Sequence, residues 1–177
     1  YLIDNNSEDE SVSYVRNNYS EVNIINLNKN YGFAEGYNRG ILKVKEEFVC
    51  IINNDVEVTK DWLKPIVKKL NNSPDLIIQP KILDINKKSH FEYAGAAGGY
   101  IDKYGYPYCR GRIFETIEED KNQYKDEEIF WSSGACMFLS KKIFNELGGF
   151  DKSFFAHMEE IDFCWRAFNY GYKTHLV

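Results

Sequence analysis

Residues 48–57 read FVCIINNDVE, so five apolar residues run directly into two asparagines and an aspartate. A short run with apolar side chains on both faces is typical of a strand buried in a parallel sheet. Open α/β sheets bind ligands outside the carboxyl ends of their strands. The stretch therefore predicts a central strand and, at Asn53, Asn54 and Asp55, the rim of a ligand site.

The flanking sequence repeats this pattern of strand and helix. Further strands are predicted at residues 1–3, 22–27 and 76–83. Helices are predicted between them at residues 8–17 and 59–70. The first of these helices begins with a capping-box pattern, in which Glu10 follows Ser7 by three residues. This alternation predicts an α/β fold with a mainly parallel central sheet flanked by helices.

The second half of the chain has a different pattern. Residues 91–111 are rich in glycine and tyrosine without a helical period, which predicts hairpins outside the main sheet. Residues 115–128 are charged and predict a surface loop. After this excursion, a strand is predicted at residues 135–139 and helices at residues 141–147 and 158–170.

Composition excludes several classes of protein. The chain of 177 residues has a net charge of −5, which argues against a general nucleic-acid binder. It contains neither a GxxxxGK[ST] phosphate loop nor a GxGxxG motif after a strand. No two of its four cysteines lie close together in the sequence, which favours reduced thiols in a cytoplasmic protein.

Three glycines, Gly32, Gly36 and Gly40, recur at a spacing of four residues. On a helix they share one face, which lets another group approach the backbone closely. Two interpretations carry about equal weight at this point. One is tight packing of a helix on the sheet, and the other is close approach of a ligand.

Three acids, Glu159, Glu160 and Asp162, fall within four positions at the start of a predicted helix. Acids there interact favourably with the helix dipole, and Asp162 can pair with Arg166 one turn later. Alternatively, the two preceding aromatic residues make a buried approach in which a carboxylate has a raised pKa and serves as general base. The residues alone leave these readings balanced.

Five motifs then occur in a characteristic order: LIDNNSEDES, NKNYGFAEGYNRGI, CIINNDVEVTKDWL, SSGACMFLSKKIFNELGGFDKSFF and HMEEIDFCWRA. The chain resembles the family-two inverting glycosyltransferases with the GT-A fold, especially bacterial rhamnosyltransferase-type members that build surface polysaccharides. The resemblance implies a single GT-A domain over residues 1–177 with a nucleotide-binding half at 1–84 and an acceptor-side half at 85–177. Because the chain starts and stops within apolar runs, we expect both ends to lie inside a longer protein.

The resemblance also implies roles for individual residues. Nucleotide contacts would come from Asp4, Asn28, Asn30, Gly32, Phe33, Asn38 and Asn54. Asp55 matches the last acid of the motif that holds a divalent cation, Mg²⁺ or Mn²⁺, on the donor diphosphate. Glu160 matches the general base, with Glu159 and Asp162 as competing assignments. Trp131 and Gly134 match the acceptor-side strand.

The implied reaction moves a sugar from a UDP- or dTDP-sugar to a hydroxyl of a glycan or lipid-linked acceptor, with inversion. Asp4 favours uracil or thymine because its carboxylate can accept from an imide N–H. The implied location is the cytoplasm, at the inner membrane face through flanking segments. Two other classes stay open: a sugar-nucleotide or glycan-binding module without turnover, slightly favoured by the lone acid Asp55, and a structural domain.

Overall fold

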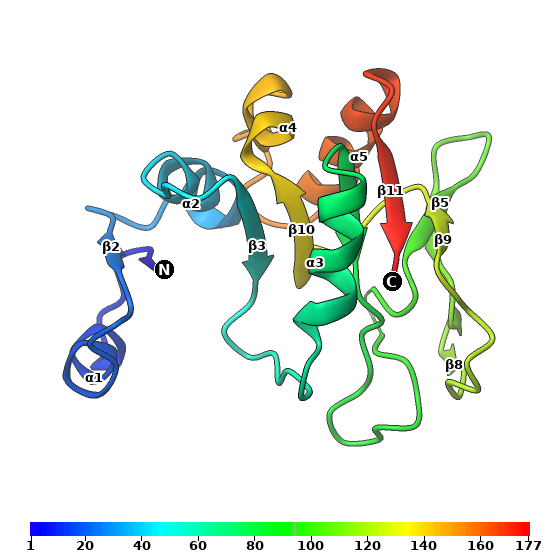
Figure 1. The fold of residues 1–177 in the computed structure, drawn as a ribbon, viewed down its shortest axis with the longest axis horizontal. Coiled ribbons are helices and arrows are strands. Elements are labelled where there is room, and N and C mark those ends of the chain that lie inside the picture. Colours follow the sequence, from blue (N-terminus) through cyan, green and yellow to red (C-terminus); the bar gives the residue numbers. More distant parts are fainter. Residues whose placement is uncertain (94) are drawn as a thin grey trace.

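The computed structural model describes residues 1–93 and 95–177. Its centre is a five-stranded sheet in the order β3 (Phe48–Ile52), β10 (Cys136–Ser140), β4 (Leu76–Gln79), β11 (Lys173–Leu176) and β9 (Glu127–Ile129). A separate parallel pair consists of β1 (Leu2–Asp4) and β2 (Ile24–Asn26). Figure 1 shows this pair beside the main sheet, next to β3.

Helices cover both faces of the main sheet. The described residues form α1 (Ser11–Asn18), α2 (Gly32–Ile41), α3 (Leu63–Asn72), α4 (Lys141–Glu146) and α5 (Glu159–Asn169). The larger core cluster joins α2, α4 and α5 to β3 and β10, and α3 packs on the opposite face through Ile66 and Leu70. None of these helices has the length and apolar character that crossing a bilayer requires.

The α/β class is confirmed, but the main sheet is mixed rather than mainly parallel. β10 runs antiparallel to β3 and to β4, and β9 runs antiparallel to β11. Only β4 and β11 form a parallel pair among the described strands of this sheet. The reason is that the chain leaves the sheet at the carboxyl end of β4 and, after its long excursion, β10 enters between β3 and β4 from that same end and therefore runs in the opposite direction.

The first helix begins later than its sequence pattern predicts. The capping box is wrong, because the Ser7 N–H donates to a carboxylate oxygen of Asp4 (3.0 Å) and residues 8–10 stay outside the helix. The Ser11 N–H donates instead to Asp9 (3.0 Å). The helix predicted at residues 59–70, α3, also starts later than predicted, at Leu63. Pro65 lies in its first turn, where the missing N–H costs no helical hydrogen bond.

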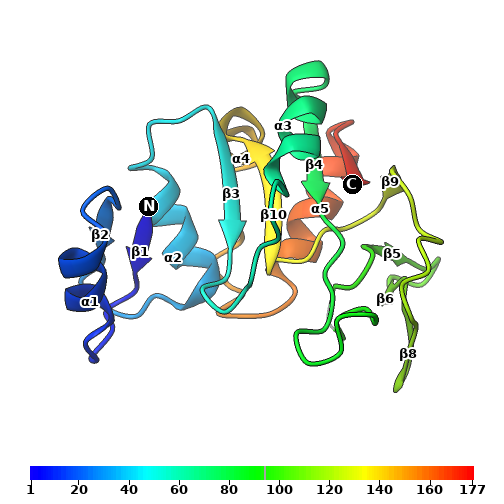
Figure 2. The same ribbon diagram turned by 60° about the horizontal axis from the view of Figure 1, so that its bottom comes forward.

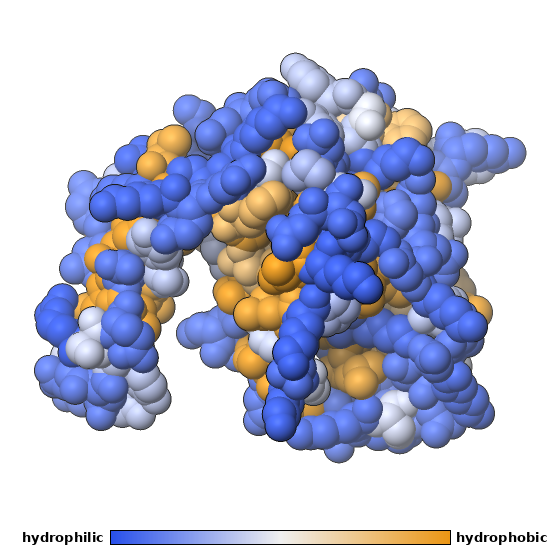
Figure 3. Space-filling model, in the orientation of Figure 1, coloured by the Kyte–Doolittle hydropathy of each residue, from blue (hydrophilic) through white to orange (hydrophobic). Residues whose placement is uncertain are grey.

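An open cleft separates β1 from β3. Each strand has a partner on one edge only, and no ladder joins the two sheets within residues 1–93 and 95–177. A cavity of about 570 Å³ runs between them. Figure 3 shows the gap between the N-terminal elements and the rest of the molecule, with apolar residues on its walls.

Helix α2 lies against β1 through its glycine face. A Cβ at Gly36 would come within 3.2 Å of the Asn5 amide, and one at Gly40 would overlap the Ile3 side chain. The packing interpretation of the glycine spacing is therefore confirmed for these two positions.

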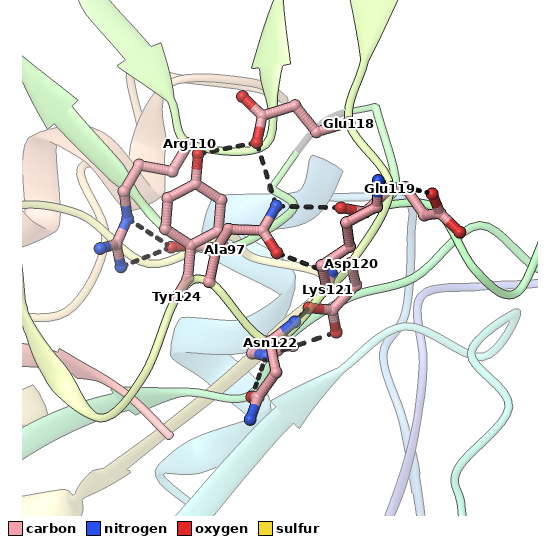
Figure 4. Close-up of polar contacts among 10 residues, drawn as sticks. Ala97, Arg110, Glu118, Glu119, Asp120, Lys121, Asn122 and Tyr124 are labelled. Atoms are coloured by element: carbon pink, nitrogen blue, oxygen red, sulfur yellow. Dashed lines mark hydrogen bonds and ion pairs between the residues drawn. The ribbon is translucent and has the colours of Figure 1, made fainter.

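The excursion forms two hairpins. Their strands are β5 (Gly99–Ile101) with β6 (Pro107–Cys109), and β7 (Arg112–Ile113) with β8 (Thr116–Ile117). The first hairpin lies within residues 91–111, as predicted, whereas the second lies beyond that range, and its second strand falls within residues 115–128, which the sequence predicted to be a surface loop. Arg110 donates through Nε and Nη2 to the carbonyl of Ala97, and Tyr124 donates to Glu118 (Figure 4). The charged segment at residues 118–124 is held by backbone hydrogen bonds: the Glu118 N–H donates to the carbonyl of Gly111 and the Asp120 N–H donates to the carbonyl of Ser89 (both 2.8 Å). All four cysteines are free thiols.

Candidate functional site

The cavity between β1 and β3 ends on polar side chains. Asp4 and Asn5 line it at the end of β1, and Asn53 and Asn54 line it after β3. Figure 2 shows that β1 and β3 point the same way, so their carboxyl ends lie at the same side of the molecule. The expected rim of amide and carboxylate groups is present, although the two strands are not neighbours in one sheet.

Asn5, which the sequence reasoning missed, organises the loop before α2. Its amide nitrogen donates to the carbonyl of Gly32 (2.9 Å) and to Asn30 Oδ1 (3.1 Å). Its oxygen accepts from the N–H of Tyr31 (3.0 Å). The only signal in the sequence is its place beside Asp4 at the end of a strand.

Two aromatic rings of α2 lie at the inner end of the cavity. The Phe33 and Tyr37 centroids are 4.7 Å apart, and both residues line the cavity. The Tyr37 hydroxyl donates to the carbonyl of Ile52 (3.1 Å). Burial, with the nearby thiols of Cys50 and Cys136, raises the pKa of Tyr37 to about 12. Tyr37 therefore stays neutral and ties α2 to the end of β3.

A buried glutamine fixes the loop between Trp131 and β10. Gln79 ends β4 and is fully buried; its Oε1 accepts from the Ser133 N–H (2.6 Å) and its Nε2 donates to the carbonyl of Gly95 (2.9 Å). Gly134 follows Ser133. A Cβ at this position would lie 3.2 Å from the Phe33 ring, so any larger residue would require the ring to move. That Cβ would lie 3.9 Å from the Cβ of Glu160. Gly134 is thus located between Phe33, which lines the cavity, and Glu160.

The three acids at the start of α5 differ in their hydrogen-bond and ion-pair partners. Asp162 forms an ion pair with Arg166 (2.8 Å), which also donates to the carbonyls of Leu147 and Gly149. Glu159 and Glu160 each carry a buried carboxylate oxygen without a hydrogen-bond partner in the described residues. Asp162 therefore has a structural partner, and the other two acids remain available.

Both available acids are shifted toward the protonated form. Burial, the largest cause, raises the pKa of Glu159 and of Glu160 above the ordinary range, and the charge of Glu159 raises that of Glu160 further. Nearby His157 acts in the opposite direction on both. The Cβ of Glu160 lies next to Gly134, which in turn packs on Phe33, so of the two acids Glu160 is the one with a contact leading toward a residue of the cavity lining.

Asp55 is the acid nearest the cavity lining after β3. It is exposed, follows the lining residue Asn54, and makes no hydrogen bond or ion pair with the described part of the chain. No group of three His, Cys, Asp or Glu side chains among the described residues is arranged to hold a metal ion. A cation at Asp55 would therefore need ligands from a bound diphosphate and water, an arrangement Mg²⁺ commonly adopts.

Some predicted site residues lie away from the cavity. Asn28 accepts from the Tyr31 hydroxyl (2.6 Å), and Asn30 accepts from the Gly32 N–H (2.8 Å). Asn38 makes two hydrogen bonds with the backbone of Phe150 (2.8 and 2.9 Å). Trp131 is buried under the β5 hairpin and donates to the carbonyl of Tyr100 (2.9 Å). Of the predicted nucleotide contacts, Asp4, Gly32, Phe33 and Asn54 line the cavity.

Solved structures with the same architecture bind UDP. The chain is similar to GalNAc-T7 with UDP, GalNAc and Mn²⁺ (TM-score 0.74, 16% identity, 99% of this chain and 35% of that chain). It is also similar to S. aureus TarS 1-349 in complex with UDP (TM-score 0.62, 14% identity, 98% of this chain and 46% of that chain). At these identities the likeness establishes the fold, which is GT-A.

Sequence relatives are named as sugar transferases. The low-salt glycan biosynthesis hexosyltransferase Agl10 of Haloferax volcanii is 25% identical over 94% of this chain and 52% of its own length. The dTDP-rhamnosyl transferase RfbF of Shigella flexneri is 24% identical over 89% of this chain and 50% of its own. An N-acetylglucosaminyl-diphospho-decaprenol L-rhamnosyltransferase of Mycobacterium tuberculosis is 23% identical over 91% of this chain and 58% of its own.

This chain spans about half the length of these relatives. The family model described as glycosyl transferase family 2 matches residues 1–148. That match covers every residue that lines the cavity and the whole of β10, and on this basis the chain belongs to glycosyl transferase family 2.

Proposed function

We propose that this chain is the donor-binding and catalytic domain of an inverting glycosyltransferase. It moves a sugar from a UDP- or dTDP-sugar to a hydroxyl of a glycan or lipid-linked acceptor. The observation that carries the proposal is the position of Glu160. Its carboxylate has a buried, unpartnered oxygen, and its Cβ lies beside Gly134, which packs on the cavity residue Phe33.

The donor nucleotide occupies the polar end of the cavity. Asp4 is nearly buried there, and one of its oxygens holds the Ser7 N–H, which fixes the carboxylate in place to accept from a uracil or thymine imide. The UDP complexes of two similar folds, and the dTDP-rhamnosyl relative, support this donor class.

Glu160 is the general base. In its deprotonated form it takes the proton of the acceptor hydroxyl as the oxygen attacks the anomeric carbon. The bond from that carbon to the diphosphate oxygen breaks on the opposite side, so the configuration inverts. Glu159, one position earlier and nearly fully buried, is the competing assignment.

Asp55 would hold a divalent cation together with the donor diphosphate. Its exposed, unpartnered carboxylate fits that role, with the diphosphate supplying further oxygens. Such a cation, when bound, would stabilise negative charge on the leaving diphosphate.

The acceptor is a glycan or a lipid-linked sugar at the inner face of the membrane. The relative that is named for a decaprenol-linked sugar supports a lipid-linked acceptor. Membrane association would come from segments flanking this chain.

Calorimetric titration with UDP, dTDP and GDP, each with and without Mn²⁺, tests the donor site. We expect one nucleotide to bind, and Asp55→Ala to weaken the part of its affinity that depends on Mn²⁺. Asp75→Ala is the matched control, because Asp75 is an exposed acid paired with Lys142 on the surface. Equal affinities of both variants in Mn²⁺ would contradict the role of Asp55, and no binding of any nucleotide would contradict the donor site.

A binding module without turnover is the second candidate, favoured by the single carboxylate at the rim. It predicts nucleotide binding without release of nucleotide from a bound donor sugar. Chromatography of donor and acceptor mixtures separates the two candidates, since only the enzyme produces free UDP or dTDP.

A further inference from the structure

Residues 150–156 form a strap between α4 and α5 whose two ends have unusual backbone geometry. Gly148 and Gly149 precede it with φ of 75° and 74°. His157 and Met158 follow it with φ of 74° and 72°. Positive φ is ordinary for glycine but uncommon for residues with side chains, and two in succession are rarer still. Contacts elsewhere must therefore keep the strap in this conformation.

The start of the strap is held by Asn38, through its two hydrogen bonds with the Phe150 backbone. Its middle folds on itself, since Asp151 accepts from the N–H groups of Ser153 and Phe154. Neither contact reaches the end that leads into α5. That end needs a separate anchor.

Phe155 provides this anchor by resting on Gly32. Its carbonyl accepts from the Phe33 N–H (2.8 Å), one of the N–H groups at the start of α2 that have no partner inside the helix. A Cβ at Gly32 would lie 2.5 Å from that carbonyl oxygen and 2.7 Å from the Phe155 ring. Within the described residues, this is the hydrogen bond that ties residues 151–157 to another element.

The contact joins the two halves of the site. Gly32 and Phe33 line the donor cavity. Three residues after Phe155, Met158 begins the turn into α5, where its carbonyl accepts from the Asp162 N–H (2.9 Å). Glu159 and Glu160 are the next two residues. The position of the acids thus depends on where Phe155 is held.

We propose that Phe155 is a positioning residue for the general base: seated on Gly32, it fixes the start of α5, and with it Glu160, relative to the donor cavity. We call the contact of Phe155 with Gly32 and Phe33 the seat. The link from the seat to catalysis rests on the proposed function, whereas the seat itself can be tested without any substrate. Misplacement of a catalytic group by about 1 Å can reduce turnover about 100-fold.

The seat is tested by hydrogen exchange in the 177-residue chain. Gly32→Ala pushes against Phe155 and should speed amide exchange in peptides covering residues 151–158. Gly171→Ala is the matched control, because Gly171 also has positive φ (90°) but nothing within 4 Å of its would-be Cβ. Equal exchange in the two variants would overturn the seat. If Gly32→Ala does not fold, Phe155→Ala tests the ring contact alone: it keeps the carbonyl that accepts from Phe33, the residue is 64% exposed, and exchange over residues 151–158 equal to that of Gly171→Ala would overturn the role of the ring.

The link to catalysis is tested by the kinetics of Phe155→Ala against Tyr104→Ala, which removes another exposed aromatic side chain, in the turn between β5 and β6. We expect kcat of Phe155→Ala to fall about 10- to 100-fold, while its Kd for UDP changes less than about twofold. Phe155→Tyr should restore kcat. Equal kcat in the two alanine variants would overturn the positioning role. Failure of the wild-type chain to bind UDP or dTDP would instead refute the proposed function and leave the exchange result standing.

Discussion

Glu160 and Asp162 lie two residues apart on α5 and have different surroundings. Asp162 forms an ion pair with Arg166, whose guanidinium also donates to the carbonyls of Leu147 and Gly149. Glu160 has a buried oxygen without a partner and a pKa raised chiefly by burial. A carboxylate that transfers protons needs surroundings like those of Glu160, without a permanent partner. A carboxylate that stabilises a helix needs a charged partner, as Asp162 has.

Replacement of Glu160 by Gln should lower turnover by about 10²- to 10⁴-fold and leave UDP affinity unchanged. Because the pKa of Glu160 is raised, the wild-type activity should rise with pH through a midpoint above the ordinary glutamate range, where the carboxyl loses its proton. Below that midpoint the group holds a proton and cannot accept another. Wild-type turnover in Glu160→Gln, with a large loss in Glu159→Gln, would move the base to Glu159.

Replacement of Asp162 by Asn should lower stability by roughly 1–2 kcal/mol in urea unfolding, because Arg166 loses its charged partner. The loss stays below that of a fully buried pair, since about 30% of each side chain is exposed. Asp61→Asn removes a more exposed pair with Lys64 and should cost less than about 0.5 kcal/mol. Equal losses for the two variants would contradict a structural role for Asp162.

At the scale of elements, α2 connects the most parts of the site. One face packs on β1 through Gly36 and Gly40, its first turn carries Gly32 and Phe33, and its Asn38 holds the strap before α5. Its sequence is adapted to close contact more than to helix propensity, since glycine is among the weakest helix formers.

Gly40→Ala should destabilise the chain by about 1–3 kcal/mol despite a gain in helix propensity of about 1 kcal/mol, because the new Cβ overlaps Ile3. Arg39→Ala, at the exposed neighbouring position, lacks this overlap. Thermal unfolding of both variants, and of Gly40→Ala with Ile3→Ala, measures the effect. If the double variant loses the full sum of the two single losses, the clash with Ile3 is not the cause.

Local sequence patterns predicted the elements better than their pairing. The apolar run Phe48–Ile52 and the spacing of Asp162 and Arg166 are local signals, and the structure contains the corresponding strand and ion pair. The antiparallel insertion of β10 depends on where an excursion of more than 50 residues returns to the sheet, which no local pattern encodes.

Site residues whose partners are remote in sequence were assigned less well. Asn38 was predicted to contact the nucleotide, yet its amide bonds Phe150, 112 residues away. Gln79 and Asn5 were missed for the same reason, because an isolated amide at a strand end gives no indication of its partner. In contrast, Asp4 and Asn54 could be placed at the rim since the ends of strands are visible in the sequence.

At the scale of the molecule, the cleft makes one cysteine accessible. Cys50 lines the cavity, whereas Cys109, Cys136 and Cys164 are buried and absent from its lining. The Sγ atoms of Cys50 and Cys136 lie 4.0 Å apart, and their interaction, with burial, raises the pKa of Cys50.

A maleimide should therefore label Cys50 first, slowly at neutral pH and faster as rising pH forms the thiolate. Peptide mapping identifies the site, and Cys50→Ser should abolish the fast phase. Labelling of Cys164 before Cys50 would mean that the cleft is closed in solution. Saturating UDP should slow the reaction if the nucleotide fills the cavity.

The cleft also determines how the width of the donor cavity is controlled. With no ladder between β1 and β3 in the described residues, side-chain packing on α2 sets the separation of Asp4 from Asn54. Ten residues of helix are about 15 Å long, so a tilt of about 4° displaces one end by about 1 Å. Small repacking at Gly36 or Gly40 therefore becomes a change in the width of the cavity between Asp4 and Asn54. If the proposed donor binds there, substitutions on α2 that do not touch it will alter which donors fit.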